Sequence, residues 1–445
     1  MSLRKDILRL TFPIFLEMLF VTLMGATDTF MLSQYSDEAV AAVGVANQII
    51  TFAFLIFQII NIGTTVLCSQ FLGAGDRKKM EQVTAMALLL NIVSGAIIST
   101  ILSCGAPTLL DWMGLDTNLK RYGVPYMHIA GSFAFFQALH LTVSASLRAD
   151  HKVMYPMMVA FAANIVNVIG NYMLIMGHWG CPALGAEGAA IATSISRGTV
   201  AVLMFGILFA KHIPFKNLIY AFRTPVRDLC HVMRDLLKIG LPSAGENMSY
   251  DAQQITLTYF INIIGTAELA TRSYVCNIAL FAYIFSICIA QGGGIVMAHL
   301  IGQHRYEACY KLGWYVLQRA VMITVGMSCI FALFGRAIFT TITDNTEIIT
   351  LGCTVLLIDV LVEIGKATNI YYVAVLRSVG DTNFPFYVGI TIQWIVGVLC
   401  GWLFGIYFGW GLVGIWCSFI LDEGIRGGIF VWRWYSKRWQ QRSFV

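Results

Sequence analysis

Long apolar segments follow one another along the 445 residues, with almost no room between them for a water-soluble domain. The chain is 58% hydrophobic and only 12% charged, about half the charged fraction of a typical soluble protein. Since an α-helix rises 1.5 Å per residue, about 20 apolar residues cross the roughly 30 Å hydrocarbon layer of a bilayer. These segments predict an all-α polytopic membrane protein with twelve spans. We expect them near residues 10–33, 43–71, 83–106, 122–147, 154–177, 188–210, 237–263, 270–300, 313–336, 348–376, 386–407 and 411–434.

The distribution of charge predicts which way the chain lies in the membrane. Twelve spans place both termini on one side, and the segments on that side are basic whereas the opposite loops are mainly acidic. Because cytoplasmic loops are enriched in Lys and Arg, both termini are expected in the cytoplasm, with the chain in the inner (plasma) membrane. The net charge of +5 follows from these loops and gives no reason to expect nucleic acid. The basic residues include Arg77, Lys78, Lys79, Arg148, Lys152, Lys211, Lys216, Arg223, Arg227, Arg433, Lys437 and Arg438.

The two halves of the chain repeat at a spacing of 229 residues. Six spans per half is an even number, so both halves enter the membrane in the same orientation, which predicts two six-helix bundles related by a parallel pseudo-two-fold repeat. The expected parts are an N-terminal bundle (1–210), a cytoplasmic linker (211–235, with Pro225) and a C-terminal bundle (236–445). A channel or a receptor would not explain this duplication. The matched residues include Pro13 and Pro242, Glu17 and Glu246, Gly63 and Gly292, Arg148 and Arg377, and Pro156 and Pro385.

Ionisable groups inside the first half mark a candidate ion or substrate site. A charged side chain at the bilayer centre costs at least about 2.5–3.5 kcal/mol, so each one requires an explanation. Glu17 and Asp28 lie about three turns apart on one face of the first span. Asn167 and Asn171 share a face of the fifth span, and Thr193 lies in the sixth. These amides and the hydroxyl could hydrogen-bond to Asp28, complete an oxygen-rich site for Na+ or H+, or simply hold helices together.

The second half carries its own acids. Glu246 and Asp251 lie on the seventh span, and Asp359 and Glu363 lie one turn apart on the tenth. Lys366 shares their helix face, so it could be a structural counter-ion for either of these two acids. All four acids are candidates for binding a substrate or a coupling ion.

The twelfth span contains charges of both signs. Arg426 follows Asp422 by one turn, with Glu423 beside it, and this spacing predicts a local ion pair near the cytoplasmic end. Over all the predicted spans, carboxylates outnumber bases among the most deeply placed groups. This excess favours a cationic substrate or coupling ion.

Short motifs along the whole chain resemble the multidrug and toxic compound extrusion (MATE) family. They lie in the first two spans, at the fifth and sixth spans, at the start of the seventh and after the tenth. The motifs are Ala26-Thr27-Asp28-Thr29, Ala39-Val40-Ala41-Ala42-Val43-Gly44, Asn167-x-x-x-Asn171, the run from Gly185 to Thr193, Gly240-Leu241-Pro242 and Leu376-Arg377-x-x-Gly380-Asp381.

This resemblance implies a fold of two six-helix bundles and export of organic cations against an inward flow of Na+ or H+. It also implies that Asp28 is the family's acid late in the first helix and that Asn167 is its asparagine in the fifth. One proton-coupled branch has an aspartate where this chain has Asn171, which weakens a proton relay through the first half. In the seventh helix Tyr250 stands nearest to the family's usual acid, and Asp251 follows it.

The resulting hypothesis is a secondary active antiporter that exports lipophilic organic cations by alternating access. The chain has no P-loop, so ATP is not the direct energy source, and Na+ or H+ is the expected coupling ion without any other cofactor. We expect a monomer in the lipid bilayer. The alternative is a flippase for a lipid-linked precursor, whose anionic cargo is disfavoured by the scarcity of unpaired Lys and Arg in the spans. The sequence contains neither an HExxH nor a GxSxG motif, so no catalytic motif of these kinds suggests an enzyme.

Overall fold

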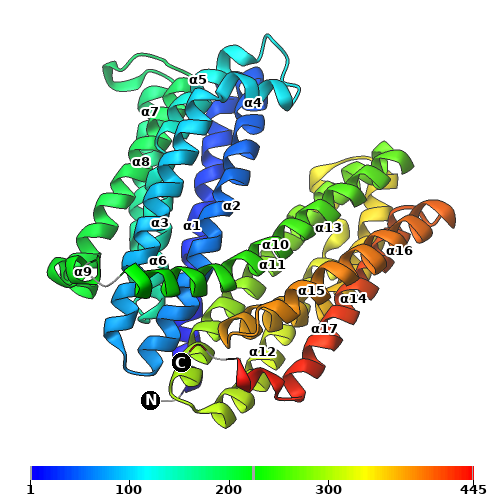
Figure 1. The fold of residues 1–445 in the computed structure, drawn as a ribbon. Coiled ribbons are helices and arrows are strands. Elements are labelled where there is room, and N and C mark those ends of the chain that lie inside the picture. The colour runs from blue at the N-terminus through cyan, green and yellow to red at the C-terminus, as the bar shows by residue number, and fades with distance from the viewer. Residues whose placement is uncertain (1–2, 223–225, 443, 445) are drawn as a thin grey trace. The chain divides into compact units, whose positions relative to one another are not determined.

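The computed structural model describes residues 3–222, 226–442 and 444, so Arg223 and Pro225 of the predicted linker lie outside the described residues. The described chain is helical throughout, without a β-strand (Figure 1). The first half contains α1 (Leu3–Ser33), α2 (Asp37–Gly73), α3 (Arg77–Cys104), α4 (Ala106–Trp112), α5 (Lys120–Ser132), α6 (Ala134–Ala149), α7 (Met154–Leu174), α8 (Ala186–Ile207) and α9 (Phe215–Phe222).

The second half consists of the helices that follow α9. They are α10 (Val226–Ile264), α11 (Thr266–Gly302), α12 (Tyr306–Leu333), α13 (Gly335–Ile342), α14 (Thr346–Ser378), α15 (Asn383–Ile392), α16 (Leu399–Trp402) and α17 (Gly411–Tyr435). Wider π-turns flank α16 at residues 393–398 and 403–407, so residues 383–407 form one continuous span.

The predicted all-α polytopic fold is confirmed. Among the described residues, nine helical segments are long and apolar enough to cross a membrane, and α5 and α6 together form a tenth span with a 44° bend. Two further helices, α10 with 39 residues and α17 with 25, are long enough to cross as well. Both correspond to spans expected from the sequence, near 237–263 and 411–434, although polar and charged residues interrupt their apolar runs. With these two helices the layout fits the predicted twelve spans.

The 229-residue repeat is visible in the helix boundaries themselves. The bounds of α2, α3 and α4 recur, residue for residue at their starts, in α11, α12 and α13, with the same displacement. The short helices α4 and α13, which the sequence analysis did not predict, are therefore a shared feature of both halves. The prolines Pro13 and Pro242 both lie inside long helices, in α1 and α10.

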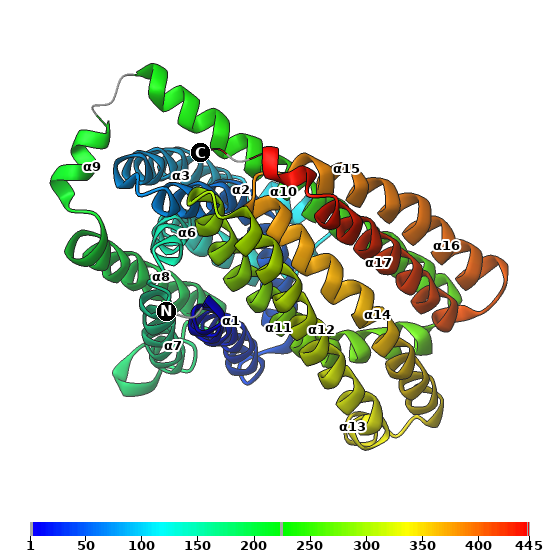
Figure 2. The same ribbon diagram turned by 90° about the horizontal axis from the view of Figure 1, so that it is seen from below.

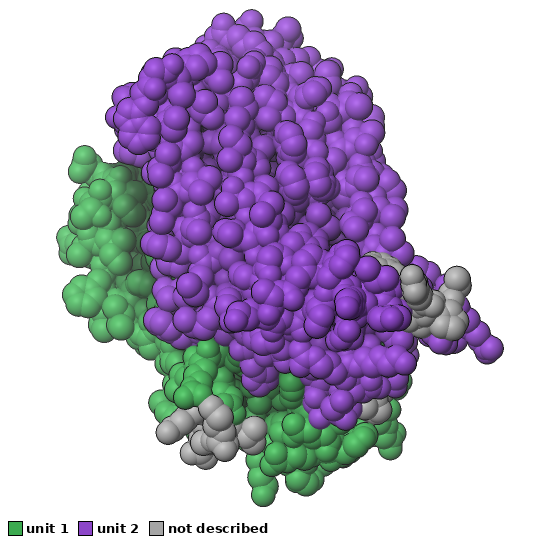
Figure 3. Space-filling model, turned by 90° about the vertical axis from the view of Figure 1, so that its left-hand side faces the viewer, with its two compact units in different colours: residues 1–11, 241–445 green, residues 12–240 purple. Residues whose placement is uncertain are grey.

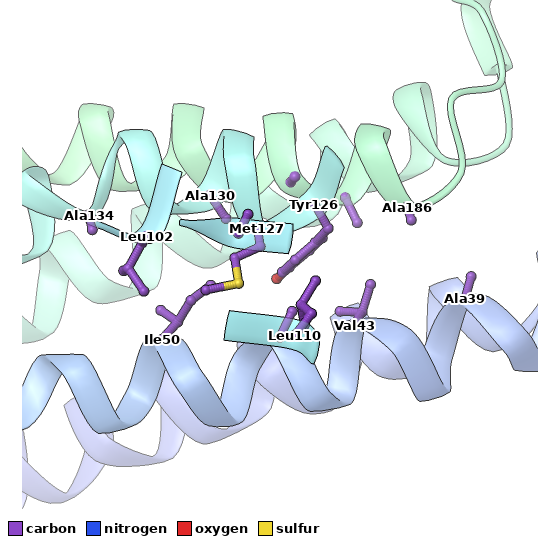
Figure 4. Packing of buried hydrophobic residues seen from close by; sticks show 14 of the residues in the cluster. Ala39, Val43, Ile50, Leu102, Leu110, Tyr126, Met127, Ala130, Ala134 and Ala186 are labelled. Carbon is purple, nitrogen blue, oxygen red and sulfur yellow. The ribbon is translucent and has the colours of Figure 1, made fainter. Parts of the chain in front are cut away.

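The helices group into two compact units, Phe12–Gly240 and Met1–Thr11 with Leu241–Val445 (Figure 3). Each unit has its own apolar core. In the unit of residues 12–240, Ile50 and Met127 are buried and point toward one another, with Leu110 beside them (Figure 4). In the unit of residues 1–11 and 241–445, Phe339 and Trp416 belong to a comparable core. Each unit can therefore be understood from its own packing.

Two helix boundaries differ from the sequence prediction for physical reasons. The fourth span was expected to be one helix, but it is broken at Phe133 between α5 and α6. The seventh span was expected to begin near residue 237, but α10 begins at Val226, inside the expected linker. The added turns are rich in charged residues, so an apolar-length criterion could not detect them.

Candidate ion and substrate site

The structure brings together the four side chains of the predicted N-terminal site. Asn171 donates from Nδ2 to Asp28 Oδ1 at 2.5 Å, and to Asn167 Oδ1 at 3.3 Å. Asn167 and Thr193 lie close enough to interact with the Asp28 carboxylate. The one-turn spacing of the two asparagines on α7 places both amides on the same face. Helices α1, α7 and α8 each supply part of this group.

Several polar atoms of this site have no hydrogen-bond partner among the described residues. These atoms are Asn167 Nδ2, Asn171 Oδ1 and Thr193 Oγ1, and all three are buried. Asp28 forms no ion pair with any described base. A partly buried carboxylate beside unsatisfied amide and hydroxyl groups has the chemistry to accept a proton or a hard cation such as Na+. Neighbouring water would satisfy the same atoms in the absence of the ion.

Glu17 and Glu246 lie elsewhere, and each is held by an arginine. Arg148 Nη2 is 2.6 Å from Glu17 Oε1, and Arg377 Nη2 is 2.5 Å from Glu246 Oε2. Both carboxylates are buried. These four residues are the repeat-related ones that the 229-residue spacing matched in the sequence. In each half this ion pair therefore links the first span of that half to its fourth span.

The acids of the tenth span lie in a cluster within the C-terminal half. Lys366 Nζ is 2.6 Å from Glu363 Oε1, so the structural counter-ion alternative applies to Glu363. Asp359 instead accepts a hydrogen bond of 3.1 Å from the indole of Trp416. Glu363 Oε2 is buried and has no described hydrogen-bond partner.

The twelfth span completes this cluster. Arg426 binds Asp422 through two hydrogen bonds of 2.9 and 2.8 Å, and its Nη2 is 2.9 Å from Glu423 Oε1. Gln253 and Asn369 donate to Asp422 and Glu423 at 2.9 and 2.7 Å. Helices α14 and α17, which carry most of these groups, lie side by side (Figure 1 and Figure 2). The predicted local pair is thus part of a larger buried ion network.

Asp251 is not drawn into this network. It lies on an exposed part of α10 and makes no hydrogen bond or ion pair with the described residues. Of the six acids considered from the sequence, it has the fewest interactions.

Arg197 and Arg272 are arginines inside the predicted spans that were not singled out from the sequence. Arg197 lies near the middle of α8, and Arg272 lies in α11. Neither forms an ion pair with a described carboxylate. Arg272 donates to Thr258 Oγ1 and to Gln254. The one-turn spacing from Thr193 to Arg197 was the signal that could have identified Arg197, and the argument from scarce unpaired bases is weaker than the sequence suggested.

Membrane-spanning helices in two repeat-related sets, with a few buried charges inside them, are typical of a polytopic membrane transporter. The model of the MatE family matches residues 13–173 and 242–403, one match in each half. The chain belongs to this family, as its motifs predicted.

Curated relatives extend over nearly the whole chain. An uncharacterized transporter of Bacillus subtilis, YisQ, is 37% identical over 440 residues, covering 98% of this chain and 95% of the relative. A probable multidrug resistance protein, NorM of Thermotoga maritima, is 25% identical over 450 residues, covering 100% and 95%.

Solved structures share the fold. An outward-facing multidrug resistance MATE family transporter of the MOP superfamily superposes with a TM-score of 0.87 at 19% identity, covering 98% of this chain and 97% of that one. A MOP superfamily transporter from Pyrococcus furiosus gives 0.88 at 19% identity, covering 100% and 98%. At this level of identity the likeness concerns the fold.

Proposed function

We propose that the chain is an antiporter that exports cationic, lipophilic small molecules from the cell in exchange for Na+ or H+. The observation that carries the proposal is the partly buried Asp28, which has amide and hydroxyl neighbours but no ion-paired base. A relative named as a probable multidrug resistance protein supports the substrate class. The basic loops support a plasma-membrane location with both termini in the cytoplasm.

In this mechanism Asp28 exchanges between an ion-loaded and an ion-free state. The empty carboxylate attracts an ion entering from outside, and the loaded carboxylate is neutral, so the attraction of the N-terminal half for a cationic substrate falls. Loading the ion and releasing the substrate are thereby linked. Each charge that moves inward through the membrane potential provides about 2.3 kcal/mol per 100 mV. The protein acts as a monomer and performs no covalent chemistry.

Na+ and H+ are both compatible with the residues present. Na+ would use the Asp28 carboxylate, the side-chain oxygens of Asn167 and Asn171, and Thr193 Oγ1. The Asn171 amide, which donates to Asp28 in the structure, would turn to present its oxygen. A proton would need only Asp28. Among the other candidates, Glu17 and Glu246 have arginine partners and Glu363 has Lys366, so a coupling role at those positions must first break an ion pair.

The test is efflux of ethidium from proteoliposomes under separately imposed Na+ and pH gradients. We expect one gradient to drive efflux by the wild type and the Asp28→Asn variant to lose the driven component. Asp344→Asn is the matched control, because it makes the same change at an exposed loop acid, and it should transport normally. Ethidium movement that is unaffected by both gradients and by the Asp28→Asn substitution would contradict the antiport mechanism. A lipid-linked anionic cargo, the flippase alternative, would then be tested with a labelled lipid in the same liposomes.

A further inference from the structure

We propose that Arg197 binds an acidic group of the transported molecule, so that the N-terminal half accepts zwitterions as well as cations. This inference rests on the proposed function and extends its substrate class from cations to zwitterions. It assigns a specificity-determining role to a residue that lies outside the Asp28 group.

The Arg197 guanidinium has N–H donors that no described residue accepts. A guanidinium carries five N–H donors. Among the described residues, Arg197 makes one hydrogen bond, a long one of 3.4 Å from Nη1 to the backbone carbonyl of Ala130, and no ion pair. Donors without acceptors are costly at membrane depth, where little water is present. The remaining N–H groups therefore call for an acceptor that the described chain does not supply.

The surroundings of the Arg197 guanidinium are partly aromatic. It lies over the ring of Phe54, 5.3 Å from the centroid, and Tyr126 is within electrostatic range. The Tyr126 hydroxyl donates to Asn47 at 3.0 Å, so it is already engaged. Arg197, Phe54 and Asn47 are only partly buried, which leaves the charged group open to a ligand. A cation held over an aromatic ring is fixed in position.

Asp28 lies in the same compact unit as Arg197. Arg197 and Asp28 interact electrostatically, but they form no ion pair. The unit therefore offers a separated positive and negative group to one ligand. A carboxylate or a similar planar acid would bind the guanidinium fork through two parallel hydrogen bonds, while an ammonium group on the same molecule would be attracted to Asp28. A purely cationic ligand would be repelled by Arg197.

The contrast with Arg272 sharpens the assignment. Arg272 is also an arginine inside a span, but it donates to Thr258 Oγ1, to Gln254 Oε1 at 2.9 Å and to the Gln254 carbonyl at 3.3 Å. Its fork is occupied by its own chain. Arg272→Gln is therefore a control for removing an intramembrane arginine without removing a ligand contact.

The test uses two dyes that differ in one acid group: rhodamine 110, a zwitterion with a free carboxylate, and rhodamine 123, its methyl ester, which is a cation. Binding to the full-length protein in detergent is followed by fluorescence anisotropy, and transport by efflux from proteoliposomes. For Arg197→Gln we expect affinity for rhodamine 110 to fall about tenfold or more, the size typical of a charge-assisted pair. Affinity for rhodamine 123 should stay the same or rise. Arg272→Gln should change the ratio of the two affinities little.

The possible results separate the inference from the proposed function. An equal loss for both dyes in Arg197→Gln, or no loss for either, would overturn the role of Arg197 as an acid-binding group. If Arg197→Gln does not fold, Arg197→Lys keeps the charge and removes the fork, and a selective loss of rhodamine 110 binding is again expected. If neither the Na+ gradient nor the pH gradient drives rhodamine 123 efflux by the wild type, the antiporter proposal fails, whereas the detergent measurement would still decide the inference.

Discussion

The two halves have repeat-related helices, but the acids inside their spans have different interaction partners. In the N-terminal half, Asp28 is surrounded by amides and a hydroxyl and has no ion-paired base. In the C-terminal half, Glu363 is paired with Lys366, and Arg426 holds both Asp422 and Glu423. The helix boundaries repeat over most of each half, so duplication preserved the backbone while the polar interior diverged. We infer that ion exchange belongs to the N-terminal half and that the C-terminal charges mainly stabilise their bundle.

The largest effect is expected from removing Arg426. Because Arg426 neutralises two buried carboxylates, Arg426→Gln leaves both uncompensated, and breaking a buried pair in this way costs about 3–5 kcal/mol. We expect a large drop in the melting temperature measured in detergent, with part of the loss recovered in the Arg426→Gln/Asp422→Asn/Glu423→Gln variant. Asp28→Asn should melt at or above the wild-type temperature. Equal melting of Arg426→Gln and the wild type would remove the distinction between the halves.

A smaller and symmetric effect is expected for the two repeated ion pairs. Glu17→Gln and Glu246→Gln each break a buried pair with an arginine, so they should lower the melting temperature by similar amounts. The double variants Glu17→Gln/Arg148→Gln and Glu246→Gln/Arg377→Gln should be less destabilised than the sum of their single changes, since neither leaves a lone charge. A strong effect in one half and none in the other would show that the pairs are not equivalent.

The loop around Asp150, between α6 and α7 in the unit of residues 12–240, should respond to pH. Burial of Asp150 opposes its ionisation, but hydrogen bonds from His212 and Lys152 outweigh burial and hold the pKa of Asp150 well below its usual range. A depressed folded-state pKa stabilises the protein above the unfolded pKa, near 3.9, and this contribution is lost as pH falls toward the folded value. The wild-type melting temperature should therefore fall more than that of Asp150→Asn between about pH 5 and pH 3. Parallel pH profiles for the two proteins would contradict this assignment.

The smallest effect is expected at Asp251. This acid is exposed and has no hydrogen bond or ion pair with the described residues, so Asp251→Asn should leave stability and ion-driven dye efflux nearly unchanged. A loss of efflux comparable to that of Asp28→Asn would place ion coupling in the C-terminal half as well.

Much of the fold was predictable because the length of each apolar run and the 229-residue repeat can be read directly from the sequence. Apolar length identified most spans, and the repeat supplied the symmetry. Neither signal could reveal the break at Phe133, the charged early turns of α10 or the short helices α4 and α13, which depend on local packing and on helix extension beyond the apolar run.

The candidate site was predictable only where one helix sets the spacing. The pair of asparagines on α7 and the link from Asp422 to Arg426 both follow from one helical turn. The partners Glu17 and Arg148 are 131 positions apart in the chain, so no local pattern connects them. The spare donors of Arg197 depend on which atoms surround it, and only the three-dimensional structure provides that information.

The most direct test of the difference between the halves is to measure ion movement coupled to the substrate. Proteoliposomes would contain a pH-sensitive dye, with 22Na+ flux followed in parallel, and ethidium would be added to the wild type, Asp28→Asn and Asp359→Asn. Asp359 is the matched C-terminal acid, since it has a hydrogen bond from Trp416 but no ion-paired base. We predict that substrate-dependent ion movement disappears in Asp28→Asn and persists in Asp359→Asn. Persistence in Asp28→Asn with loss in Asp359→Asn would contradict the assignment of ion exchange to the N-terminal half.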